Sequence, residues 1–231
     1  MFQAVLVRPL FNLLIVIYNV LPVPDLGLAT ILFTVLVWGV LLYPLSRKLF
    51  ASQEAMTKLQ PELKRLQEVH KHDRGEQAKA TMTLYREHGV NPFTGCIVIL
   101  VQLPIFFALF RVFSLATNPE NLSLLYGFVS QPAAVHATLF GLLDLARPNA
   151  VLAVLTGLAQ FVQSKLTILP LAPDARAQDF TRIMSVQTTY VFPVLIAFAA
   201  LSFPAGLSLY WVTSTSLQIA QRLWAKRKSH G

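Results

Sequence analysis

Charged residues are scarce in this sequence. They make up 13% of its 231 residues, whereas hydrophobic residues make up 55%. A soluble domain carries about 25% charged residues, so this chain lacks the charge that a surface facing water on all sides requires. The charges are segregated into a few blocks, and the long apolar runs between those blocks carry almost none. This pattern excludes an ordinary soluble domain and is typical of a protein that crosses a membrane several times.

Residues that could carry catalysis or bind a metal are also few. Cys96 is the only cysteine, so the chain can form neither an internal disulfide nor a cysteine metal cluster. No acidic residue lies deep within an apolar run, which excludes an intramembrane aspartyl protease and argues against a proton-coupled carrier. The histidines lie outside those runs, and the pair His70 and His72 has no evident third ligand. We therefore expect a protein that is not an enzyme and holds no cofactor or metal.

Long apolar runs are the main feature of the chain. A bilayer core of roughly 30 Å requires about 20 helical residues. Five segments meet or approach that length: 26–45, 93–113, 150–168, 186–202 and 205–221. The sequence SFPAG between the last two marks a tight turn and therefore a hairpin of two helices. A sixth apolar segment, 4–20, is interrupted by Arg8, Pro9 and Asn12. We expect it to form a helix in the membrane interface rather than a span.

The distribution of cations predicts the orientation in the membrane. The 46–91 loop is rich in Lys and Arg, the 115–148 loop contains only Arg147, and the chain ends in RLWAKRK and three further residues. The positive-inside rule then places the 46–91 loop and the C-terminus in the cytoplasm and the N-terminus outside. Topology also explains the net charge of +8 more simply than a nucleic-acid surface would, so we expect no DNA partner. The resulting localisation is a multi-pass protein of the bacterial cell membrane.

The 51–90 segment is predicted to form a cytoplasmic helical hairpin. Apolar residues recur there at three- and four-residue steps, the pattern breaks at Gly75, and a second helix follows from 76 to 88. Two interpretations stay open. The pair is either a solvated connector that rests on lipid headgroups or a docking arm or mobile lid, and amphipathicity alone does not separate them.

Uncharged polar residues occur within the predicted spans. Thr156, Gln160 and Gln163 fall on one stripe of the third, and further hydroxyl and amide groups lie in the fifth. Because an amide facing lipid tails would lack a partner, these groups must face each other or water. Interhelical hydrogen bonding is one explanation and a wet groove is the other. A stripe of this size favours the groove.

Two segments carry a resemblance to a known family. Residues 85–110, YREHGVNPFTGCIVILVQLPIFFALF, and residues 203–214, FPAGLSLYWVTS, resemble membrane protein insertases of the YidC/Oxa/Alb type. The resemblance implies an all-α polytopic fold with five transmembrane helices around a hydrophilic groove that opens to the cytoplasm. It also implies an N-terminal interfacial helix and a cytoplasmic helical hairpin within a single insertase domain, 1–231. The large extracytoplasmic domain of many relatives is expected to be absent, as in the short bacterial form.

The same resemblance implies a function in protein transport. Such a protein is an insertase and chaperone, in which groove water and amides solvate the polar tail of a nascent helix while its apolar part moves into lipid. Its partners would be nascent membrane proteins and the lipid bilayer, with the ribosome and a Sec-type translocon as further candidates. The candidate groove residues are Thr34, Trp38, Gln102, Thr156, Gln160, Gln163, Tyr210, Trp211 and Ser214.

The chain departs from the family at Trp38. Relatives usually carry an arginine four residues after the threonine matched by Thr34, and here Trp38 is followed by one extra residue before Pro44. In the family that cation is thought to attract acidic tails. Arg111 is a candidate substitute, although it lies about 13 Å along the helix from Gln102, and snorkelling to the outer interface also explains it. We therefore expect a groove that handles less acidic tails.

Two other functions remain as alternatives. In a small transporter or channel, the polar stripe would line a solute path, but carriers often contain internal repeats and this sequence shows none that we detect. In a translocon assembly subunit, the helices would only pack against a neighbouring protein. Insertion of a single-span substrate under depletion of the protein distinguishes the insertase from both.

Overall fold

The computed structural model describes residues 2–43, 52, 55–56, 58–91, 94–116, 123–167 and 185–229. The α-helices are α1 (Arg8–Val20), α2 (Leu26–Val37), α4 (Gln60–Val69), α5 (Arg74–Glu87), α6 (Thr94–Ala116), α7 (Ala150–Thr167), α9 (Phe192–Ala200) and α10 (Ala205–Ser229). Three π-helical turns adjoin them: η1 (Gln3–Val7), η2 (Trp38–Leu42) and η4 (Gln187–Val191). The mostly helical class predicted from the sequence is confirmed.

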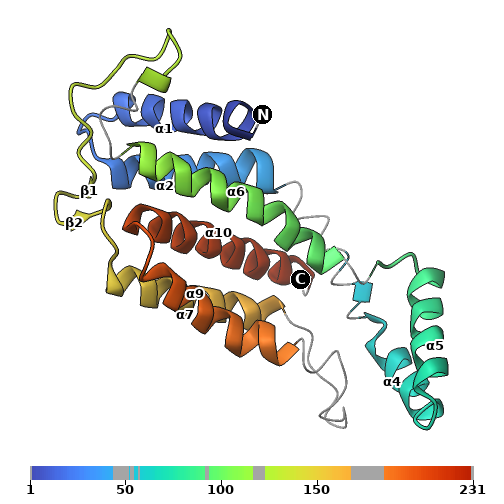
Figure 1. The fold of residues 1–231 in the computed structure, drawn as a ribbon. Coiled ribbons are helices and arrows are strands. Elements are labelled where there is room, and N and C mark those ends of the chain that lie inside the picture. The colour runs from blue at the N-terminus through green and yellow to red at the C-terminus, as the bar shows by residue number, and fades with distance from the viewer. Residues whose placement is uncertain are drawn as a thin grey trace.

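Helices α1, α2, α6, α7, α9 and α10 form a bundle, and α4 and α5 form a separate hairpin (Figure 1). Helix α10 contacts α2 and α6 on one side and α7 on the other, while α1 packs on α2 and α6, and α9 packs on α7. Helices α4 and α5 contact each other away from the bundle (Figure 1). A short antiparallel ribbon, β1 (Thr138–Leu139) and β2 (Leu143–Asp144), lies beside the start of α2.

The lengths of the apolar helices bear on the membrane topology. Within the described residues, Gln3–Val20 and Ala150–Thr167 are long and apolar enough to cross a membrane. Shorter apolar helices cover Leu26–Val40, Leu103–Ala116 and Gln187–Ala200. A helix therefore occupies each segment predicted to span, but the number of spanning helices stays a prediction.

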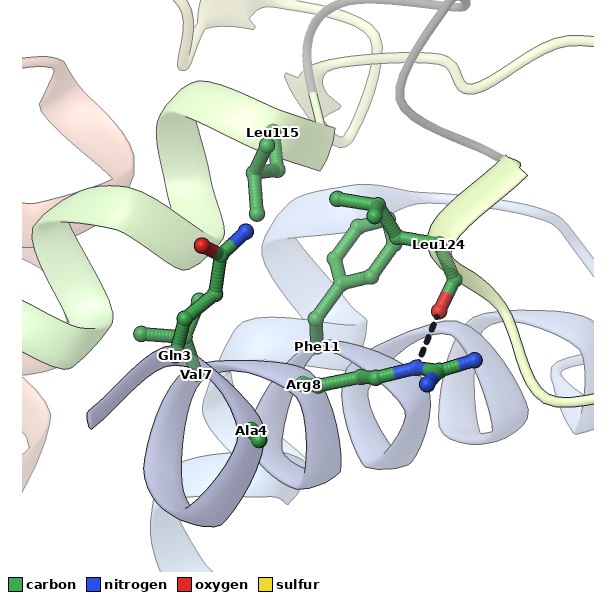
Figure 2. A pocket seen from close by; sticks show the side chains of 7 residues that line it. All are labelled: Gln3, Ala4, Val7, Arg8, Phe11, Leu115 and Leu124. Carbon is green, nitrogen blue, oxygen red and sulfur yellow. Dashed lines mark hydrogen bonds between the residues drawn. The ribbon is translucent and has the colours of Figure 1, made fainter. Parts of the chain in front are cut away.

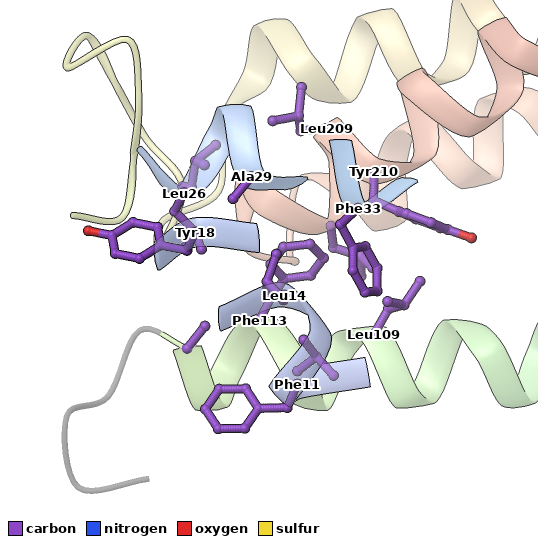
Figure 3. Close-up of a cluster of buried hydrophobic side chains, with 14 of the residues drawn as sticks. Phe11, Leu14, Tyr18, Leu26, Ala29, Phe33, Leu109, Phe113, Leu209 and Tyr210 are labelled. Carbon is purple, nitrogen blue, oxygen red and sulfur yellow. The ribbon is translucent and has the colours of Figure 1, made fainter. Parts of the chain in front are cut away.

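The core of the bundle lies between α1, α2, α6 and α10 (Figure 3). Phe11 of α1, Phe33 of α2 and Phe113 of α6 are almost completely buried there. Helix α10 approaches closely because Gly206 has no side chain: a Cβ at that position would lie 2.8 Å from Cδ1 of Phe113. Small residues at helix crossings are a common way to pack helices in membranes, where lipid competes with apolar contacts.

The polar residues of α1 are bound by the segment that follows α6. Arg8 Nε donates to the carbonyl of Leu124 at 3.0 Å, and Asn12 Oδ1 accepts from the N–H of Tyr126 at 2.7 Å. Further along, Asn19 Nδ2 donates to the carbonyl of Ser130 at 2.7 Å. The hydroxyl of Tyr18 donates to the carbonyl of residue 134 and accepts from the N–H of residue 136. Arg8 and Asn12, which interrupt this apolar segment in the sequence, thus bind residues 124–136, which we call the outer loop after the topology predicted from the sequence.

The hairpin of α4 and α5 begins its second helix slightly earlier than the sequence pattern indicates. Asp73 Oδ1 accepts from the backbone N–H groups of Gly75 and Glu76, at 2.9 and 3.0 Å. This side chain satisfies amides that have no partner within the helix, so α5 starts at Arg74 and Gly75 lies in its first turn. Gly75 therefore belongs to the first turn of α5, whereas the sequence pattern placed the break between the two helices at this residue.

Candidate functional site

Amide and indole groups of α7 and α10 meet in a continuous line of hydrogen bonds. Trp211 Nε1 donates to Gln160 Oε1 at 3.2 Å, and Gln160 Nε2 donates to Gln163 Oε1 at 2.9 Å. Gln163 Nε2 then donates to Gln218 Oε1 at 2.5 Å. We call these four residues the α7–α10 seam. All four are half-buried, so the seam is neither sealed in the core nor fully open.

Polar contacts continue the seam toward both ends of the two helices. At one end, the Oγ1 of Thr156 donates to the carbonyl of Leu152 at 2.7 Å and lies 3.5 Å from the carbonyl of Ser208. At the other, Arg222 Nη2 lies 3.4 Å from the carbonyl of Thr167. The spacings of three and four residues place these groups on one face of each helix. The polar contacts therefore follow the α7–α10 interface along much of its length.

The seam bears on the two explanations for the polar stripe, which are hydrogen bonding between helices and a wet groove. Its hydrogen bonds are those expected from the first explanation. Each glutamine amide has two N–H donors and an oxygen with two lone pairs. The oxygen and one N–H of Gln160, and likewise of Gln163, are engaged within the seam. Each amide therefore keeps capacity for a further hydrogen bond. The structure supports the bonding interpretation directly, and the groove interpretation depends on this remaining capacity.

Aromatic rings of α6 stand beside the seam. The ring of Phe106 lies edge-on to that of Trp211, with centroids 5.5 Å apart, and makes a similar contact with Phe203 at 5.5 Å. The hydroxyl of Ser214 donates to the carbonyl of Trp211 at 3.1 Å within α10. Tyr210, the neighbour of Trp211, points instead into the core cluster and is 2% exposed (Figure 3). Of these predicted residues, Trp211 belongs to the seam and Tyr210 belongs to the core.

Thr34 and Trp38 lie on α2 and at its end, away from the seam contacts. Thr34 is completely buried, and its hydroxyl donates to the carbonyl of Thr30 at 2.6 Å. Trp38 is half-buried, with its ring edge-on to that of Tyr43 at 5.4 Å. Its Nε1 is buried and has no hydrogen-bond partner among the described residues. Among the described residues, no hydrogen bond joins the side chain of Thr34 or Trp38 to Gln160 or Gln163.

The extra residue that follows Trp38 falls in a π-helical turn. The N–H of Tyr43 bonds the carbonyl of Trp38, five residues earlier, rather than the carbonyl four residues earlier. Such a turn takes one additional residue into a helix, and π-helical turns occur often at functional sites. Local widening of the helix can therefore take up the extra residue that the sequence resemblance indicates after Trp38.

The two remaining candidates are less closely tied to the seam. The backbone of Gln102 lies in α6, and its side chain lies outside the part of the chain that the structure describes. Arg111 is exposed on the same helix, and no salt bridge joins it to another described residue. Its role as a substitute cation stays a prediction.

Sequence reasoning missed Gln218 and Arg222 as members of the site. Both follow Ser214 at four-residue steps, so the spacing alone could have extended the stripe by two residues. Arg222 lies beyond the predicted span 205–221, and desolvation lowers the pKa of its guanidinium. An arginine nevertheless stays charged at neutral pH. Among the described residues, no group of three His, Cys, Asp or Glu could hold a metal ion.

Comparisons with known proteins give a consistent result. A family described as 60Kd inner membrane protein matches residues 16–231. A membrane protein insertase YidC from Francisella tularensis subsp. novicida (strain U112) is 37% identical over 196 residues, which are 85% of this chain and 31% of that relative. The YidC of Francisella tularensis subsp. holarctica (strain LVS) has the same identity and coverage.

A solved structure resembles the fold as well. It is described as an active YidC insertase crystal structure with the first transmembrane domain resolved. The TM-score is 0.62 at 27% sequence identity, and the match covers 95% of this chain and 46% of that one. The chain therefore spans less than half of the length of that structure and 31% of the length of the curated relatives.

Proposed function

The chain belongs to the 60Kd inner membrane protein family, and we propose that it inserts nascent membrane proteins into the bilayer and assists their folding. The resemblance seen in residues 85–110 and 203–214 predicted this family, and the comparisons confirm it. The observation that carries the functional proposal is the α7–α10 seam. Its half-buried amides lie on the facing sides of α7 and α10 and retain hydrogen-bonding capacity.

In the proposed topology, five helical segments cross the membrane and the N-terminal helix lies at the outer interface. The contacts of α1 support the second part. Its bonds to the outer loop run from Arg8 to Asn19, which is about 16 Å of helix. If α1 crossed the bilayer, the irregular backbone of the outer loop would follow it into hydrocarbon, where each unpaired backbone group costs several kcal/mol. An interfacial α1 keeps that backbone in contact with water.

In the proposed mechanism, the seam forms the wall of a groove open to the cytoplasm. A polar tail that enters the bilayer alone loses water at a cost of several kcal/mol per unpaired group. Amides of Gln160 and Gln163 offer replacement hydrogen bonds, which lower that cost part-way across. The apolar segment of the substrate meanwhile moves into lipid, where its transfer gains about 25 cal/mol for each Å² removed from water. Substrate partitioning thus supplies the driving force.

Trp38 defines the class of substrate in this proposal. Where relatives carry a cation, this chain has an indole, which carries no charge and whose N–H is buried. We infer that neutral and weakly acidic tails are preferred. The ribosome and a Sec-type translocon are proposed partners, since a nascent substrate must be delivered from one or both.

The proposal is tested by making the seam apolar. Cells depleted of the protein are supplied with a variant carrying Gln160→Leu, Gln163→Leu and Gln218→Leu, and insertion of a single-span substrate with a short polar tail is followed by protease protection. We expect insertion to fall about tenfold, because losing one or two tail hydrogen bonds costs roughly 1.4 kcal/mol or more. Val162→Leu, on the exposed face of α7, is the matched control. Unchanged insertion by the triple variant at equal protein level would overturn the proposal.

A further inference from the structure

A cavity separate from the seam lies where the start of α1 meets the outer end of α6 (Figure 2). Its volume is about 340 Å³. One side is formed by Gln3, Val7, Arg8 and Phe11, and the other by Leu115 of α6 and Leu124 of the outer loop. The insertion mechanism proposed above uses none of these residues.

The cation of this cavity is held in a fixed orientation. Arg8 Nε donates to the carbonyl of Leu124 at 3.0 Å, drawn as the dashed line in Figure 2. The guanidinium carbon also lies 4.7 Å from the centre of the Tyr126 ring, a cation–π distance. Within the described residues, neither of the two terminal nitrogens of Arg8 makes a salt bridge or a hydrogen bond. The exposed guanidinium therefore presents two terminal N–H groups to an incoming ligand.

The rest of the cavity is amphipathic. Phe11 and Val7 are buried at its base, and Leu115 and Leu124 add apolar walls. Gln3 places its side-chain amide beside Leu115, across the cavity from Arg8 (Figure 2). Among the described residues, no carboxylate lines the cavity. The arrangement combines one amide and a cation that no described carboxylate neutralises with an apolar base, which matches a ligand that has an anionic head and a hydrocarbon body.

We propose that this cavity binds an anionic phospholipid of the surrounding membrane. The phosphodiester would accept two hydrogen bonds from the terminal nitrogens of Arg8, the planar donor geometry that guanidinium groups offer to phosphates. The first part of an acyl chain would cover Phe11 and Leu115. A volume at the low end of ligand pockets suits a headgroup and the start of one chain rather than a whole lipid. The inference rests on the interfacial placement of α1 proposed above.

The same contacts predict which lipid headgroup the cavity prefers. Phosphatidylglycerol carries one negative charge and hydroxyl groups that can pair with the amide of Gln3. Phosphatidylcholine carries the same phosphate together with a quaternary ammonium, which the guanidinium of Arg8 would repel. The site should therefore prefer phosphatidylglycerol.

The test uses the full chain in detergent micelles and native mass spectrometry. Phosphatidylglycerol or phosphatidylcholine is titrated in, and the fraction of protein that carries one lipid is measured. We expect tighter binding of phosphatidylglycerol, and a loss of affinity of about tenfold or more in Arg8→Gln, since charge-assisted hydrogen bonds are removed. Leu115→Trp, which enlarges an apolar wall into the cavity and keeps the cation, should weaken binding similarly. Arg147→Gln removes another exposed arginine, outside the cavity, and should change nothing.

Several outcomes would overturn the inference. One is that Arg8→Gln binds phosphatidylglycerol as tightly as the unchanged protein does. Another is that Arg147→Gln loses as much affinity as Arg8→Gln, and a third is that Leu115→Trp leaves the affinity unchanged. Complete displacement of the lipid by excess inorganic phosphate would show an anion site without an acyl-chain component, which also contradicts it. If thermal unfolding shows that Arg8→Gln is unstable, the lipid affinity of Leu115→Trp alone tests the inference. Lipid binding in micelles is measured independently of insertion, so failure of one proposal leaves the other distinguishable.

Discussion

The seam and the α1–outer loop contact both satisfy polar side chains within apolar helices, but with different partners. In the seam, amide side chains bind other amide side chains, both within α7 and from α7 to α10. On α1, side chains bind backbone groups of the outer loop, as Asn12 does with Tyr126. A backbone group is held in place by the conformation of the loop, whereas an amide side chain can rotate and exchange its hydrogen-bond partner. Polar residues that bind backbone groups of the outer loop hold the fold, whereas the amides of the seam are, in the proposed mechanism, available to a substrate.

This difference has an energetic basis. Asn12 is 3% exposed, and its side chain joins Arg8 of its own helix to the outer loop through Tyr126. Removing such a group leaves the N–H of the half-buried Tyr126 without its side-chain partner, which costs about 1–3 kcal/mol in addition to the lost bonds. Interhelical bonds between side chains in membranes average only about 0.6 kcal/mol, because the separated helices find other partners. The two regions should therefore respond differently to the same kind of substitution.

The largest effect is expected at Asn12. Asn12→Leu should lower the free energy of unfolding by about 2–3 kcal/mol, since it strands the N–H of Tyr126 and removes the bond to the carbonyl of Arg8. Unfolding by SDS in mixed micelles measures the change. Asn19→Leu is the matched control, because Asn19 is exposed and water can replace it at the carbonyl of Ser130. Equal destabilisation by both variants would contradict the distinction between fixed and replaceable partners.

A smaller loss of stability is expected at the centre of the seam. Gln163→Leu removes two side-chain bonds and should lower the free energy of unfolding by about 1 kcal/mol. The same variant should clearly reduce insertion of a polar-tailed substrate. Stability is read from SDS unfolding and insertion from protease protection, with Val162→Leu as control. A loss of stability as large as that of Asn12→Leu, with insertion unchanged, would make the seam a purely structural contact.

The sequence indicated the fold more completely than the site. Long apolar runs located the helices because hydrophobic length is a local property of the chain. The three- and four-residue steps of Thr156, Gln160 and Gln163 likewise placed them on one face, and the structure bonds all three in the α7–α10 interface. Periodicity within one helix does not say which partner each residue selects. Gln163 binds Gln218, 55 positions later, through packing that no local pattern encodes.

Two other features were beyond sequence reasoning for related physical reasons. Arg8 and Asn12 marked α1 as unusual, but their partners lie in an irregular loop more than a hundred positions away, where no periodic pattern exists. Thr34 was expected in the groove from family position, yet its hydroxyl bonds the carbonyl of Thr30 in its own helix and is completely buried. A short hydroxyl can always turn back to its helix, so its residue type does not reveal whether it faces a groove.

The smallest expected effect concerns charge at the end of α2. Trp38→Arg should raise insertion of acidic-tailed substrates about two- to fivefold relative to neutral-tailed ones, since one partly solvated ion pair contributes up to about 1 kcal/mol. The introduced charge would lie at the start of the π-helical turn Trp38–Leu42. Trp38→Gln is the neutral control and should leave the ratio of acidic to neutral insertion unchanged. Paired substrates that differ only in tail charge give the ratio. If the unchanged protein and Trp38→Arg insert acidic and neutral tails equally well, substrate charge is not read at this position. The uncharged seam would then act alone, as its amides recognise polarity rather than sign.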